Sequence, residues 1–293
     1  MPKDKQLSLS SQSKSSSSST ITNNIINRIN KNFSKIQNIL SLYLKNPNEK
    51  NIHDIRKSIR RADSAYMILP KKYRKKKRFV KYIGTSKKFF KVNSKIRDYD
   101  IYLEKVQQYS EISENDDNNI KPTILRYRNS ELENAVVVAK KLKELKCPQI
   151  QIKKENKKLN KQIDNQFDKI SNKFEQIIED NMPLVITDDK RIKELHEVRK
   201  DCKKLRYILE LKLNDNEKNE ELSELLNNLE NIQDNLGKIH DCDATISFFE
   251  KLKPQTKVHD QIIYNEKQNR INLYERFVNK YNTTIKKNLS FVS

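Results

Sequence analysis

The sequence predicts an all-α fold, built from two tandem four-helix-bundle repeats related by pseudo-twofold symmetry. Glycine occurs only twice in 293 residues and tryptophan never, while Lys, Asn, Ile, Leu and Glu fill most positions. This composition favours long helices over strands joined by tight turns. Apolar residues recur at spacings of three and four along most of the chain, which is the period of an amphipathic helix. Two motifs also repeat at one fixed offset, which predicts a duplicated unit.

Prolines and polar capping residues divide the chain into elements. Residues 1–20 are rich in serine and lack apolar periodicity, so we expect a disordered tail. Residues 21–290 are expected to form one helical domain, with its first repeat over about 22–147 and its second over about 151–290. The expected helices cover about 22–45, 48–69, 74–109, 122–147, 152–181 (ended by Pro183), a segment that starts after a Thr187 cap, 217–252 and 255–289.

The repeat rests on two pairs of short motifs. IHDIRKSIRR at Ile52–Arg61 matches LHEVRKDCKK at Leu195–Lys204, and KIRDYD at Lys95–Asp100 matches KIHDCD at Lys238–Asp243. Both pairs are separated by the same offset of 143 residues. Two independent matches at one offset predict that the first four helices and the last four are copies of one unit.

Each copy of the first motif predicts a helix with an apolar stripe and an adjoining basic face. Ile52, Ile55 and Ile59 share one side of the first copy, and Leu195 and Val198 do so in the second. Like charges crowded on one helix face destabilise it, so a bound anion is expected to neutralise them. The candidate anion-binding residues are His53, Arg56, Lys57, Arg60 and Arg61 in the first copy, and His196, Arg199, Lys200, Lys203, Lys204 and Arg206 in the second.

Overall charge points to a polyanionic partner. The formal net charge is +21, and eleven of the residues from Lys71 to Lys91 are Lys or Arg while none is acidic. Arginine forks suit phosphate groups because they can donate two hydrogen bonds to one group. A linear polyphosphate would engage one cationic group after another. We expect histidine to add a donor whose charge rises as the pH falls through about 6.5.

Other functional classes receive less support from the sequence. A helical nucleic-acid-binding protein is the main alternative, since phosphate contacts dominate that class too, but the aromatic residues are not gathered on the basic faces. With only Gly84 and Gly237, a glycine-rich phosphate loop cannot be built. The sequence therefore predicts no catalytic residue, no metal site and no cofactor. The three unclustered cysteines indicate no disulfide framework, and no apolar stretch is long enough for a membrane span. We expect a soluble, cytoplasmic protein.

The acidic residues of the second motif have a separate expected role. Asp100 follows Arg97 by three residues and Asp243 follows His240 by three, so each pair shares a helix face. We expect Asp100 and Asp243 to hold neighbouring cations in position for an anion.

Together these motifs resemble the CHAD family. The pattern is His, then Arg three residues later and more basic residues, followed by a helix with a basic residue, Asp, any residue and Asp. Two positions depart from it: Asp63 stands where the second copy has Arg206, and His240 stands where the family has Arg. The resemblance implies two four-helix repeats that bind inorganic polyphosphate through basic residues lining a central cavity, often in association with polyphosphate granules. It also adds residues of the KIRDYD and KIHDCD motifs to the candidate contacts: Lys95, Arg97, Lys238 and His240. An accessory or regulatory role beside a polyphosphate- or triphosphate-metabolising enzyme stays open, as does the oligomeric state.

Overall fold

The computed structural model describes residues 9–110, 120–151, 157–213, 219–253 and 256–285. Every regular element in these ranges is helical, which confirms the all-α prediction. The elements are α1 (Leu9–Lys45), α2 (Glu49–Met67), α3 (Lys71–Arg74), α4 (Lys77–Ser110), α5 (Ile120–Lys143), α6 (Lys157–Thr187), α7 (Ile192–Leu209), the 3-10 turn η1 (Glu210–Lys212), α8 (Glu220–Phe249), α9 (Lys257–Lys280) and the π-helical turn η2 (Tyr281–Ile285).

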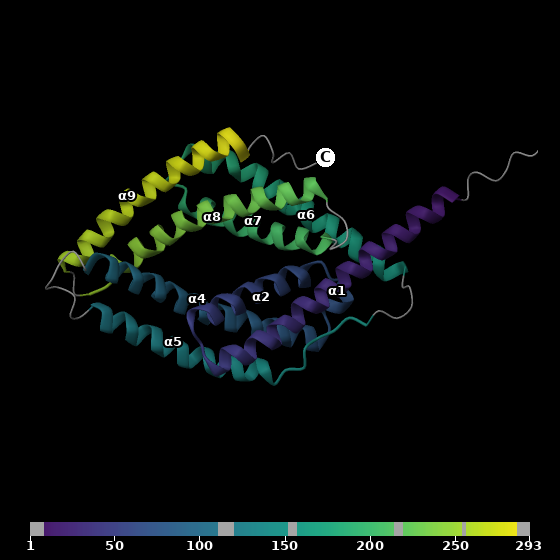
Figure 1. The fold of residues 1–293 in the computed structure, drawn as a ribbon, viewed down its shortest axis with the longest axis horizontal. Coiled ribbons are helices and arrows are strands. Elements are labelled where there is room, and N and C mark those ends of the chain that lie inside the picture. Colours follow the sequence, from purple (N-terminus) through teal and green to yellow (C-terminus); the bar gives the residue numbers. More distant parts are fainter. Residues whose placement is uncertain (1–8, 111–119, 152–156, 214–218, 254–255, 286–293) are drawn as a thin grey trace, which may run out of the picture.

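The helices form two halves that follow the order of the chain. In Figure 1, α1, α2, α4 and α5 lie together on one side, and α6 to α9 lie together on the other. The halves meet where α2 packs against α7 and where α4 packs against α8 and α9. α7 and α8 begin 143 residues after α2 and α4 respectively, the offset at which the sequence motifs repeat.

A large apolar core runs through both halves, and a smaller one lies near the ends of α4 and α8. In α2, Ile52 and Ile55 are fully buried, and in α7 Val198 and Cys202 are fully buried. Each large apolar side chain removed from water contributes about 1.5–3 kcal/mol to stability. This burial fixes how α2 and α7 are rotated about their own axes. Their adjoining basic faces are therefore not free to turn elsewhere.

Asparagine caps start two of the helices that carry the repeated motifs. The side chain of Asn48 accepts a hydrogen bond from the backbone N–H of Asn51 at 2.9 Å, and that of Asn219 accepts one from Leu222 at 2.9 Å. Such caps satisfy backbone donors that have no partner inside the helix. They set where α2 and α8 begin.

The N-terminal boundary differs from the prediction. α1 begins at Leu9, so residues 9–20 are helical where the sequence predicted a disordered tail; residues 1–8 lie outside the described part. No proline or glycine occurs between Lys3 and Lys45, so no residue in this segment breaks the helix. Serine itself tolerates a helix at a modest cost. The N-terminal part of α1 extends away from the rest of the molecule in Figure 1.

The predicted end of the helix before the second motif is also wrong. α6 continues through Pro183 to Thr187, and α7 starts at Ile192 with Arg191 as its N-cap residue, not after a Thr187 cap. Met182 and Val185 are 2% and 0% exposed, so burying this last turn offsets the hydrogen bond that proline removes. The Thr187 hydroxyl donates to the carbonyl of Pro183 at 2.9 Å.

Candidate anion-binding site

The basic faces of α2 and α7 meet between the two halves. They line two adjoining cavities, a central pocket of about 520 Å³ and a side pocket of about 370 Å³. Both cavities are bordered by Arg56 and Arg60 from α2 and by Arg199 and Lys203 from α7. Two helices far apart in the sequence thus place four cationic side chains in walls that the cavities share.

The central pocket is strongly cationic. Eight Lys or Arg side chains and four carboxylates line it. The cationic residues are Arg56, Lys57, Arg60, Arg97, Arg199, Lys203, Arg206 and Lys238, and the acidic ones are Asp98, Glu230, Asp234 and Asp241. The excess of positive charge favours an anion inside the cavity.

Packing against α4 holds the arginines of α2. Arg56 donates to the backbone carbonyl of Asn93 at 2.8 Å. The guanidinium carbons of Arg56 and Arg60 each lie 5.3 Å from the centroid of the Phe90 ring. A guanidinium over an aromatic face is stabilised by the ring quadrupole. These contacts fix the arginine stems and leave further N–H groups available for a ligand.

The four basic side chains that border both cavities are half-buried. Among the described residues, Arg56, Arg60, Arg199 and Lys203 form no ion pair with a carboxylate. The Nε atoms of Arg60 and Arg199 are buried without a hydrogen-bond partner in the protein. A buried donor left unsatisfied costs about 1–3 kcal/mol. These side chains therefore carry charge that the protein's own hydrogen bonds do not fully satisfy.

Crowding of these charges changes their proton affinities. Burial, followed by repulsion from Arg60 and Arg199, lowers the pKa of Lys203 to about 6. Burial also lowers the pKa of Arg56 to about 10, with repulsion from Arg60 adding to the effect. Arg56 is still charged at neutral pH, whereas Lys203 is largely neutral there without an anion. The same desolvation raises the pKa of the Asp98 carboxyl. These shifts mark a site whose positive charge is only partly compensated, through Asp98 and Asp241.

The histidines of the two repeats differ in environment. His53 is exposed and lies 3.6 Å from the Asp54 carboxylate. His196 instead packs against His240, with 3.1 Å between their Nδ1 atoms. Burial and the nearby Arg199 lower the pKa of His196 to about 4 and that of His240 to about 3. The expectation that these histidines gain charge near pH 6.5 is therefore wrong for this pair in the ligand-free protein.

Thirteen of the fifteen predicted residues border the central or the side pocket. They are His53, Arg56, Lys57, Arg60, Arg97, His196, Arg199, Lys200, Lys203, Lys204, Arg206, Lys238 and His240. The other two lie elsewhere: Lys95 pairs with Glu131 at 2.5 Å outside both cavities, and Arg61 pairs with Glu210 at 2.9 Å in a third cavity.

Several of the predicted cations that do border the pockets are already paired. Arg97 lies 2.5 Å from Glu49, and Arg206 lies 2.5 Å from Glu230. Lys204 bonds Asp201 at 2.8 Å on its own helix. The unpaired cations are therefore concentrated on the walls that the central and side pockets share.

The two aspartates of each Asp-x-Asp motif have different roles, and neither role is the expected one. Asp100 accepts from Arg128 of α5 at 2.5 Å, and Asp243 accepts from Arg270 of α9 at 2.5 Å. Neither aspartate borders the central or the side pocket, so they do not hold the anion-facing cations. Asp98 and Asp241 border the central pocket instead. The spacing of the motif could have predicted that its two aspartates face different surroundings, because residues two apart point to different sides of a helix.

The comparisons agree with this architecture. A family model described as CHAD domain matches residues 27–250. A crystal structure of the CHAD domain from the plant Ricinus communis has the same fold, with a TM-score of 0.56 and 13% sequence identity over 93% of this chain and 92% of that one. No curated protein matches the chain.

Proposed function

We propose that this chain, which belongs to the CHAD family, binds linear inorganic polyphosphate in the central pocket without catalysing a reaction on it. One observation supports this most strongly: Arg56 and Arg60 from one half converge with Arg199 and Lys203 from the other, and no carboxylate pairs with them in the described residues. Buried like charges without partners are costly. A polyanion that enters between the halves compensates both sets at once.

The kinds of donor in the pocket favour phosphate. Guanidinium groups donate in a planar fork that matches two phosphate oxygens, and these charge-assisted bonds are stronger than neutral ones. A chain of phosphates presents a fresh set of oxygens every few ångströms. Such a ligand can bond the terminal guanidinium N–H groups of Arg60 and Arg199 in turn.

The aromatic residues of the site argue against the nucleic-acid alternative. Phe90 borders the side pocket, and Tyr207 borders both pockets. Phe90 already lies under Arg56 and Arg60, and Tyr207 has Arg61 and Arg206 at 5.5 and 4.9 Å from its ring centroid. Nucleobases are held by stacking on open aromatic faces. Rings occupied by guanidinium groups suit a ligand that has phosphates but no bases.

A competition titration tests the proposal. Long-chain polyphosphate and single-stranded RNA or duplex DNA are titrated against one another at matched salt, because salt weakens all of these complexes. We expect polyphosphate to displace both nucleic acids. Displacement of polyphosphate by either nucleic acid contradicts the proposal, and release of inorganic phosphate that EDTA abolishes contradicts the non-catalytic assignment.

A further inference from the structure

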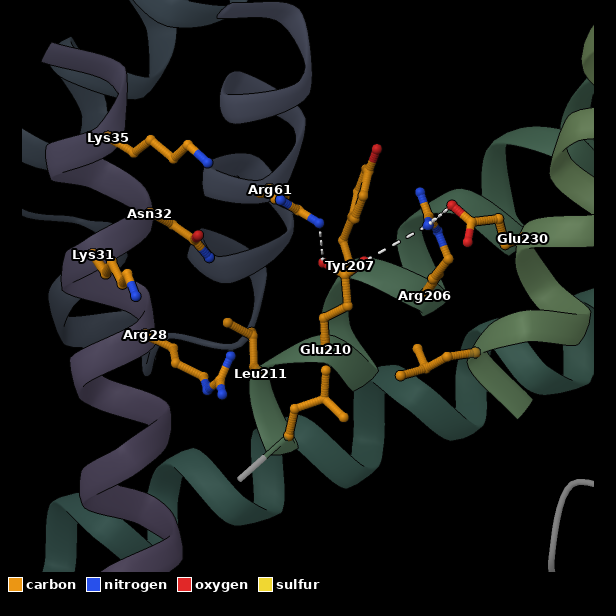
Figure 2. A pocket seen from close by; sticks show the side chains of 12 residues that line it. Arg28, Lys31, Asn32, Lys35, Arg61, Arg206, Tyr207, Glu210, Leu211 and Glu230 are labelled. Carbon is orange, nitrogen blue, oxygen red and sulfur yellow. Dashed lines mark hydrogen bonds and ion pairs between the residues drawn. The ribbon is translucent and has the colours of Figure 1, made fainter. Parts of the chain in front are cut away.

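A further cavity adjoins the central pocket. A third cavity of about 370 Å³, the α1 pocket, shares Arg206, Tyr207 and Glu230 with the central pocket. It lies where α1 faces η1 and α8 (Figure 2). A linear ligand that occupies the central pocket therefore has a route past Tyr207 toward α1.

The two walls of the α1 pocket differ in charge. On one wall, Glu210 pairs with Arg61 at 2.9 Å, and Glu230 pairs with Arg206 at 2.5 Å. Figure 2 shows Glu210, Arg206 and Glu230 across from α1, and Arg61 reaches Glu210 from α2. The positive charge of Arg61 and Arg206 is thus compensated by carboxylates. This wall therefore offers an anion little net attraction.

The α1 wall carries two lysines without a partner among the described residues. Arg28, Lys31 and Lys35 extend from α1 toward the cavity in Figure 2. Lys31 and Lys35 are four residues apart, so they lie about one helical turn from each other on the same face. Within the described residues, neither forms a hydrogen bond or an ion pair. Both are exposed, so their ammonium groups can reach a ligand without leaving a partner.

We infer that Lys31, Lys35 and the neighbouring Arg28 form an extension subsite, which binds the part of a linear polyphosphate chain that emerges from the central pocket. This inference rests on the proposed function. The opposite wall has little net charge, so the chain is attracted to the lysines of α1. Affinity then increases with chain length after the central pocket is filled, since α1 contacts only the extra phosphates.

A pair of charge-reversal variants tests the subsite. Lys31→Glu/Lys35→Glu is compared with Lys169→Glu/Lys173→Glu, whose lysines are also four apart and exposed on α6 but border none of the three pockets. Both variants change the net charge equally. Isothermal titration calorimetry at fixed salt measures binding of long-chain polyphosphate and of tripolyphosphate. We expect the α1 variant to bind long chains roughly fivefold or more weakly than the α6 variant, with equal affinities of the two variants for tripolyphosphate.

The remaining outcomes contradict either the subsite or the proposed function. Equal weakening of long-chain binding in the α1 and α6 variants overturns the subsite, because the effect is then one of overall charge. Long-chain binding as tight as that of the unaltered protein overturns it too, as does equal weakening of tripolyphosphate and long-chain binding by the α1 variant. If the unaltered protein binds neither ligand, the proposed function itself fails and the subsite with it.

Discussion

At Lys203, burial and repulsion act in the same direction. Together they lower the pKa of this ammonium group to about 6, against about 10.4 for an unperturbed lysine. Between these two values the unfolded chain binds more protons at this position than the folded protein does. The contribution of Lys203 to the free energy of unfolding therefore rises with pH across this window and is at its most unfavourable below about pH 6.

Lys203→Met should remove this unfavourable contribution. At pH 6 we expect the variant to be more stable than the unaltered protein by about 1 kcal/mol or more, because its buried side chain no longer carries a charge. The difference should shrink as the pH approaches 10. Urea unfolding at several pH values measures it. A variant that is equally stable or less stable at pH 6 contradicts the assigned environment of Lys203.

Anion affinity should also depend on pH through Lys203, but it should fall as the pH rises. A bound phosphate favours the charged ammonium and raises the pKa of Lys203, so binding takes up a proton near neutral pH. For the unaltered protein, affinity should increase as the pH falls from 8 toward 6, and the increase should be smaller in Lys203→Met. Calorimetry in buffers of different ionisation enthalpy counts the protons taken up.

Single-residue properties were only partly predictable from the sequence. The sequence placed both His196 and His240 among the candidate site residues, but 44 positions separate them. Their 3.1 Å contact comes from the packing of α7 against α8. That contact lies within a buried cationic cluster and accompanies the low pKa values of both rings. Local sequence supplied the residue types, whereas tertiary packing determined their protonation.

At the scale of elements, the Asp-x-Asp motif links helices as well as bordering the pocket. Arg128 donates to Asp100 between α5 and α4, and both side chains are largely buried. On α8 and α9, Arg270 bonds Asp243 and also contacts Asp189 in the connection before α7. The second aspartate of each motif therefore ties the last helix of each half to the rest. The first aspartate borders the central pocket.

Two substitutions in one motif should affect different properties, one the stability of the protein and the other its affinity for polyphosphate. Asp100→Asn leaves Arg128 without a charged partner, so we expect the free energy of unfolding to fall by about 1.5–3 kcal/mol, with unchanged polyphosphate affinity of the folded protein. Asp98→Asn removes a negative charge from the central pocket and should tighten polyphosphate binding without loss of stability. Urea unfolding and calorimetry distinguish the two. Weaker binding by folded Asp100→Asn, with no gain in Asp98→Asn, contradicts this division of roles.

Helix ends were predicted correctly where neighbouring residues in the sequence determine them. Asn48 caps α2, close to where the sequence predicted that this helix begins. At Pro183 the local signal was misleading, because burial of Met182 and Val185 holds the last turn of α6 in place. A single sequence shows which residues are apolar, but it does not show how much of their surface the neighbouring helices cover.

At the scale of the whole molecule, function depends on how the halves face each other. The repeated motifs predicted two basic faces, and the contact between α2 and α7 brings them to shared cavities. The repeat could not predict this arrangement by itself, since two copies could also pack with their basic faces outward. The α1 pocket was missed because Lys31 and Lys35 belong to neither repeated motif.

Charge reversal on both sides of the central pocket tests the central claim most directly. Arg56→Glu/Arg199→Glu is compared with Lys169→Glu/Lys173→Glu, which has the same net charge, by calorimetry with long-chain polyphosphate at matched salt; circular dichroism checks the helix content of both. We expect the arginine variant to bind well over tenfold more weakly, since each charge-assisted contact contributes about 1.5–3 kcal/mol. Equal affinities for two folded variants would contradict a polyphosphate site between the halves.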